Sequence, residues 1–156
     1  MSKTNRHSMT TPAANTGPKM GRISLTEFVG KWRLTRDIQE HTGGITTFSG
    51  EAVLSESDAQ LEYRESGRVT LANSKTIHAE RIYIWRNGLN GQIDVYFADK
   101  RFFHSFSADK PYAEHLCGND LYKVTYDFTR WPVWESVWQV KGPRKDYTMV
   151  SHYAPL

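Results

Sequence analysis

The sequence is poor in cysteine and in long apolar runs. A single cysteine, Cys117, among 156 residues excludes an internal disulfide framework and favours a reducing, cytoplasmic setting. No apolar run approaches the roughly 18 residues that a membrane span requires, so we expect a soluble protein with no membrane partner. The length suits one compact domain with a sizeable core.

The start of the chain lacks acidic and aromatic side chains altogether. Four of the 20 basic residues lie there, namely Lys3, Arg6, Lys19 and Arg22. The formal net charge of +3 therefore belongs to this segment, because 16 basic and 17 acidic side chains remain from Ile23 onward. We expect residues 1–22 to be a disordered basic tail and residues 23–156 to fold. Since the folded part is nearly neutral, nucleic acid is not an expected partner.

Period-two segments rich in β-branched and aromatic residues dominate the rest of the chain. These segments lie at residues 30–39, 45–55, 59–71, 76–86, 92–98, 101–107, 113–117, 120–128, 133–141 and 146–153. Short turn sequences separate them, and Ser24 followed by Glu27 is typical of a capping box on a short helix. The sequence therefore predicts an all-β protein: a single up-and-down antiparallel β-barrel of about ten strands, with a short N-terminal helix.

Three predicted hairpins assign faces to these strands. A two-residue loop at 118–119 would pair Cys117 with Asp120 and His115 with Tyr122. A two-residue loop at 99–100 would place three side chains of the next strand inside, namely Phe102, His104 and Phe106. The last hairpin would bring together Trp134, Ser136, Trp138, Val140, Tyr147, Met149, Ser151 and Tyr153. For residues 76–86 we choose the face that contains Arg81, Tyr83 and Trp85, because its aromatic content is greater.

The predicted inner face is mostly apolar but carries polar groups that converge. The candidate ligand-binding residues are Arg36, Tyr63, Glu65, Arg81, Tyr83, Trp85, His104, His115, Asp120, Tyr122, Trp134, Trp138 and Tyr147. A buried charge must be paired or must face a ligand or a wet cavity. Either an internal Arg–Glu pair or a ligand clamp would satisfy this requirement, and the sequence favours neither. The charged turn at 142–146 is solvated or contacts an anionic ligand at the rim.

Short motifs carry a resemblance to known families. Residues 28–32, Phe-Val-Gly-Lys-Trp, resemble the Gly-x-Trp signature of lipocalins and their calycin relatives, in which the Trp packs across the closed end of the barrel. The motifs at 36–38, 63–67, 81–85, 99–104, 115–122 and 138–147 resemble a lipocalin-like, mainly bacterial domain-of-unknown-function family. Lys100 departs from the glycine usual in that family's turn. The resemblance implies a calycin-type barrel but no activity.

Two classes of function follow from these observations. The first is a binding protein that holds an aromatic or amphipathic, anionic small molecule in the barrel, oriented by Arg36 or Arg81. The second is a small-barrel enzyme, of decarboxylase, isomerase or hydratase type, that acts on an aromatic acid and moves a proton with Glu65 or His115. We expect a monomer or homodimer.

Metal and haem sites are further alternatives. No cofactor is predicted. Zinc on His115, Cys117 and Asp120 is not excluded, although their spacing is not that of a recognised closed zinc set. Haem is likewise not excluded, with His104, His115 or His152 as an axial ligand.

Overall fold

The computed structural model describes residues 22–156, so the predicted tail lies outside the described residues except for Arg22. Each predicted strand is present. The elements are η1 (Leu25–Phe28), β1 (Gly30–Glu40), β2 (Ile45–Ser57), β3 (Gln60–Thr70), β4 (Thr76–Asn87), η2 (Leu89–Gly91), β5 (Ile93–Phe97), β6 (Phe102–Phe106), β7 (Tyr112–Cys117), β8 (Asp120–Asp127), β9 (Trp134–Lys141) and β10 (Asp146–Pro155). None of the described helices is long and apolar enough to cross a membrane.

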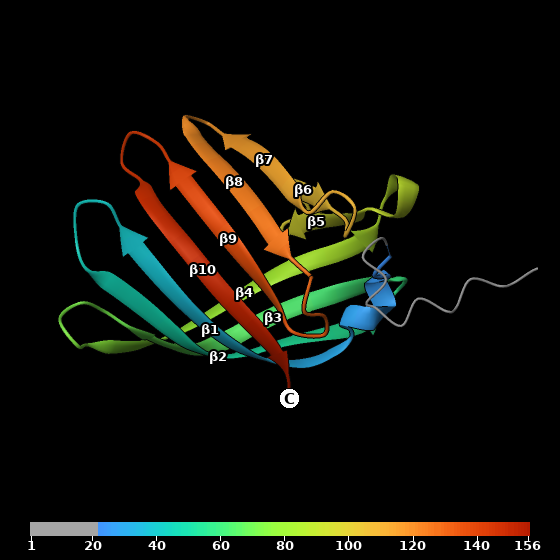
Figure 1. The fold of residues 1–156 in the computed structure, drawn as a ribbon, viewed down its shortest axis with the longest axis horizontal. Coiled ribbons are helices and arrows are strands. Elements are labelled where there is room, and N and C mark those ends of the chain that lie inside the picture. Colours follow the sequence, from blue (N-terminus) through green and yellow to red (C-terminus); the bar gives the residue numbers. More distant parts are fainter. Residues whose placement is uncertain (1–21) are drawn as a thin grey trace, which may run out of the picture.

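The ten strands form one antiparallel sheet that curls into a nearly closed barrel (Figure 1). Its order is β6-β5-β4-β3-β2-β1-β10-β9-β8-β7, so β1 to β6 and β7 to β10 are two meanders joined by the pairing of β1 with β10. The two ends of this order, β6 and β7, lie next to each other, but no strand register joins them in the described part of the chain. This arrangement confirms the predicted up-and-down barrel.

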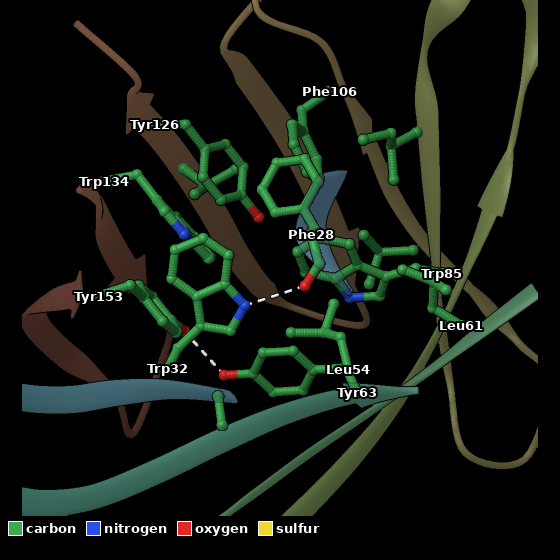
Figure 2. Close-up of a cluster of buried hydrophobic side chains, with 14 of the residues drawn as sticks. Phe28, Trp32, Leu54, Leu61, Tyr63, Trp85, Phe106, Tyr126, Trp134 and Tyr153 are labelled. Atoms are coloured by element: carbon green, nitrogen blue, oxygen red, sulfur yellow. Dashed lines mark hydrogen bonds between the residues drawn. The ribbon is translucent and has the colours of Figure 1, made fainter. Parts of the chain in front are cut away.

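One end of the barrel is closed by the short helix η1 and the aromatic residues around it. Glu27 accepts a hydrogen bond from the Ser24 backbone N–H at 2.6 Å, as the predicted capping box requires. The fully buried Phe28 ring lies among six other aromatic rings, and its carbonyl accepts a hydrogen bond from Trp32 Nε1 at 2.9 Å (Figure 2). The loops β1–β2, β3–β4 and β9–β10 lie at the opposite end (Figure 1).

The strand registers confirm most of the predicted faces. Cys117 pairs with Asp120 and His115 with Tyr122, as the two-residue loop at 118–119 requires. Trp85 is buried on the inner side of β4, which confirms the chosen face of that strand. In the β9–β10 hairpin the predicted inner residues are all buried or half-buried, because alternate side chains of a strand share a face.

The hairpin between β5 and β6 differs from the prediction. The Phe97 N–H donates to the Arg101 carbonyl at 2.8 Å across a three-residue loop, and the Phe97 carbonyl accepts from the N–H of Lys100, which adopts the left-handed conformation with φ of 75°. A β-bulge at Phe103 then restores the register, so that His104 opposes Val95. The prediction that Phe102 points inward is therefore wrong: Phe102 is half exposed and Phe103 takes its place in the core.

Candidate functional site

A cavity of about 240 Å³ lies inside the barrel, between the aromatic residues of the closed end and the loops of the open end. Eleven of the thirteen predicted binding residues line it: Arg36, Tyr63, Glu65, Arg81, Tyr83, Trp85, His104, Tyr122, Trp134, Trp138 and Tyr147. His115 and Asp120 do not line it. His115 instead packs its ring against Phe103, and Asp120 forms an ion pair with Lys145 at 3.2 Å.

Arg36 and Glu65 form a buried bidentate ion pair in the cavity wall. Arg36 Nη1 and Nη2 donate to the two Glu65 oxygens at 2.6 and 3.0 Å, and Arg36 Nε donates to Ser151 Oγ at 2.7 Å. Tyr63 donates its hydroxyl proton to Glu65 at 2.7 Å, so Tyr153 is the donor in the 2.7 Å contact between the two hydroxyls (Figure 2). The pair is thus held by neighbours from β3 and β10, and this arrangement favours the core pair over the ligand clamp.

The electrostatics of this pair follow from the same contacts. Burial alone would raise the pKa of Glu65, but hydrogen bonds from Arg36 and Tyr63 outweigh it and the pKa is lowered. Burial would lower the pKa of Arg36, and the Glu65 carboxylate reverses that direction. Both groups therefore remain charged, and the Glu65 carboxylate has little spare basicity for proton transfer.

Arg81 differs from Arg36 in being exposed and in having no carboxylate partner among residues 22–156. It lies opposite Glu65 in the register of β3 and β4, yet Glu65 is already engaged by Arg36. Its one hydrogen bond goes to the Tyr83 hydroxyl at 3.3 Å, and no acidic side chain within residues 22–156 forms an ion pair with it. The Tyr83 phenol raises the pKa of Arg81, so the guanidinium stays charged at the cavity surface.

A second cation lies at the open end of the cavity. Lys145, in the β9–β10 loop, donates to the Tyr122 hydroxyl at 2.9 Å as well as pairing with Asp120. Burial raises the pKa of the nearby Tyr147, whereas the charges of Lys145 and Arg81 act to lower it. Tyr147 therefore lies close to both cations, of which Lys145 is paired with Asp120 and Arg81 has no acidic partner within residues 22–156.

At the inner end of the cavity, His104 is buried and neutral. Burial, followed by the charge of His115, lowers the pKa of His104 to about 3. Its Nε2 lies 2.8 Å from the Tyr126 hydroxyl, and its Nδ1 has no hydrogen-bond partner among residues 22–156. Trp134 also lines the cavity, and its buried Nε1 likewise finds no partner in the part of the chain that the structure describes.

Stacked aromatic rings form the wall between these two ends. Phe103 lies nearly parallel to Phe97 at 4.4 Å and to Trp138 at 5.0 Å between ring centroids. Sequence reasoning missed Phe103 because nothing in the alternation signals a bulge. The other cavity residues outside the predicted binding set are Val95, Phe97, Cys117, Tyr126, Ser136, Val140, Lys145, Met149 and Tyr153. Most of these lie on faces that the hairpins had already placed inward, so the strand pattern could have found them.

The metal candidates do not gather into a site. In the part of the chain that the structure describes, no group of three or more His, Cys, Asp and Glu side chains is placed to hold a metal ion. Cys117 is exposed, and His152 forms an ion pair with Glu135 at 3.0 Å on the outer surface.

Comparison with known proteins places this chain in a family. Residues 28–155 match the model of a family of unknown function, DUF6314. The chain belongs to this family. Among solved structures, it is similar to the S-type phycobiliprotein lyase CPES from Guillardia theta, with a TM-score of 0.50 and 11% sequence identity over 86% of this chain and 92% of that one. That likeness shows a shared lipocalin-like barrel fold. No curated protein matches the sequence.

Proposed function

We propose that this barrel binds a small aromatic or amphipathic ligand with an anionic group, held inside the cavity. The observation that carries the proposal is Arg81, a cavity-lining guanidinium whose only hydrogen bond within residues 22–156 goes to a tyrosine hydroxyl. A guanidinium presents paired N–H donors that match a carboxylate or phosphate. Arg81 is exposed, so water solvates its remaining N–H groups, and an anionic ligand that enters the cavity would take the place of that water.

The surroundings of Arg81 support an anion with an aromatic body. Lys145 and Tyr147 add a positive charge and a hydroxyl at the same end of the cavity. Beyond them, Phe103 and Trp138 stack on each other with ring centroids 5.0 Å apart and give the cavity an apolar aromatic wall that suits an aromatic body. At about 240 Å³ the cavity is smaller than the roughly 300–1,000 Å³ typical of drug-sized ligands, so we propose a molecule of one or two rings.

Glu65 and His115, the two groups that an enzyme mechanism would use for proton transfer, are placed for structural contacts rather than for catalysis. Glu65 is occupied by Arg36 and Tyr63, and His115 lies outside the cavity lining. For this reason we propose binding rather than turnover as the function.

The test uses naphthoate, a two-ring carboxylate, and its neutral amide as paired probes. We expect the wild-type protein to bind naphthoate about tenfold or more tightly than naphthamide, measured by quenching of tryptophan fluorescence. In Arg81→Gln this preference should fall to near parity, because the charged partner is lost. The matched control is Arg68→Gln, an exposed arginine on the outer side of β3, which should keep the preference. Equal affinity of wild type for the two probes, or an unchanged preference in Arg81→Gln, would contradict the proposal.

A further inference from the structure

The contact between Lys145 and Tyr122 brings two hydrogen-bond donors close together at the open end of the cavity. Lys145 Nζ donates to the Tyr122 hydroxyl oxygen at 2.9 Å, because an ammonium group has no acceptor. The hydroxyl proton of Tyr122 is then free to donate elsewhere, and within residues 22–156 no other side chain accepts it. Both residues line the cavity, Tyr122 from β8 and Lys145 from the β9–β10 loop.

Lys145 also keeps one N–H group for a ligand. Of its three N–H donors, one goes to Tyr122, and the ion pair with Asp120 Oδ2 at 3.2 Å engages a second. The hydrogen bond to Tyr122, followed by that to Asp120, raises the pKa of Lys145, so the ammonium keeps all three protons. The Lys145 side chain is 44% exposed and Tyr122 is half-buried, so water reaches this contact when no ligand is bound.

A single oxygen atom can accept from both donors. Hydrogen bonds to oxygen are about 2.7–3.2 Å long, and the two donor atoms lie 2.9 Å apart. An oxygen at hydrogen-bonding distance from both atoms therefore completes a triangle with sides of nearly equal length. Asp120 does not line the cavity, so its ion pair does not fill the cavity side of this contact.

The charges around the two cations of the cavity differ, and this difference decides what each suits. The charge of Lys145 is already compensated by Asp120, which would also repel a second carboxylate brought to Lys145. Arg81 has no acidic partner in the described part of the chain. An anion therefore favours Arg81, whereas the contact between Lys145 and Tyr122 suits a neutral acceptor oxygen.

We propose that Lys145 and Tyr122 form an acceptor subsite, which binds a neutral carbonyl oxygen of the ligand while Arg81 binds its anionic group. This inference rests on the proposed function, because it requires a ligand in the cavity with its anion at Arg81. Tyr147 lies close to both cations, so the acceptor subsite and Arg81 belong to the same end of the cavity. The ligand class narrows to aromatic acids that also carry a carbonyl group.

Benzoates with a second substituent ortho, meta or para to the carboxylate test this inference. In each isomer the substituent is acetyl or isopropenyl, two groups of the same shape of which only acetyl has an acceptor oxygen. We expect the wild-type protein to bind at least one acetyl isomer about tenfold more tightly than its isopropenyl counterpart, measured by quenching of tryptophan fluorescence. If no acetyl isomer is preferred while naphthoate still binds more tightly than naphthamide, this inference is overturned and the proposed function stands. If naphthoate and naphthamide bind equally, the proposed function fails and this inference fails with it.

A second carboxylate on the probe separates a neutral acceptor from a second anion. The benzenedicarboxylate of the preferred isomer should bind no more tightly than the acetylbenzoate, because Asp120 repels the added charge. Tighter binding of the dicarboxylate would show that the subsite takes an anion, and it would overturn the assignment of a neutral acceptor.

Variants locate the acceptor contact. Tyr122→Phe keeps the ring but removes the hydroxyl, so it should reduce the acetyl preference to about twofold or threefold while the isopropenyl probe binds as before. The control Tyr112→Phe removes the hydroxyl of a 57% exposed tyrosine of β7 that does not line the cavity, and it should keep the full preference. A full preference in Tyr122→Phe would refute the role of Tyr122.

A spectroscopic measurement on the wild-type protein does not depend on how these variants fold. With ¹³C at the Cζ atoms of the tyrosines, the Tyr122 signal should shift further with the preferred acetyl probe than with its isopropenyl counterpart, because only the acetyl oxygen accepts from the hydroxyl. Equal shifts of the Tyr122 signal with the two probes would overturn the acceptor subsite.

Discussion

Removing one partner of the Arg36–Glu65 pair should destabilise the barrel strongly. Glu65→Gln keeps the shape of the side chain but removes its charge, and it weakens the three hydrogen bonds that Glu65 accepts from Arg36 and Tyr63. Arg36, only 8% exposed, would then be a buried charge with no counter-ion. Breaking a buried pair in this way costs about 3–5 kcal/mol, and we expect a loss of that size in the free energy of unfolding.

The assay is urea denaturation followed by tryptophan fluorescence, completed as a double-mutant cycle. The cycle consists of Arg36→Met, Glu65→Leu and the variant with both substitutions. Because the double variant removes both charges together, it should be less destabilising than the sum of the two single variants, with a coupling energy of at least ~2 kcal/mol. The control Glu80→Gln, in the exposed pair with Arg64, should leave the midpoint almost unchanged. A loss below about 1 kcal/mol in Glu65→Gln, or additive single and double variants, would refute the buried-pair reasoning.

Two further predictions concern His104 and Lys100. The pKa of His104 is about 3 in the folded barrel and near 6.5 ordinarily, so as the pH falls the unfolded chain takes up a proton before the folded protein does. The contribution of His104 to the free energy of unfolding is therefore complete above pH 6.5. Below pH 6.5 it declines by about 1.4 kcal/mol per pH unit. Urea midpoints between pH 7 and pH 5 should show this decline, whereas in His104→Phe the slope should flatten; parallel curves for the two proteins would contradict the assignment. Lys100→Gly should raise the free energy of unfolding by about 0.5–1 kcal/mol, because a left-handed conformation is strained for lysine. The control Lys110→Gly, at a position where φ is not positive, should lower the free energy of unfolding. Thermal melts measure both changes. A drop in stability for Lys100→Gly would show that its φ carries no strain.

Alternation of side chains along the strands was enough to predict the barrel and much of its cavity wall. Arg36 and Glu65 could be predicted to point inward because each interrupts an apolar face. Their pairing could not be predicted, because it depends on the distance between β1 and β3 across β2, which the periodicity of a single strand does not encode. The same limit applies to Lys145, which reaches Tyr122 from a loop that has no period. Phe103 was missed since a bulge changes the face of a strand without changing its composition.

The ladder between β1 and β10 has a consequence for the order in which the barrel assembles. Arg36 and Ser151 are 115 positions apart, so their contact closes a long loop, and we expect it to form after the local hairpins; during synthesis it cannot form before β10 has been made. The strands β1 to β3 can bring Arg36 and Glu65 together before the last strand has been made. Until β10 docks and covers them with Ser151 and Tyr153, the paired charges face water, where leaving them unburied costs little. We therefore expect the desolvation cost of this ion pair to arise only at the last step of folding, when β10 docks and the aromatic core closes around the pair.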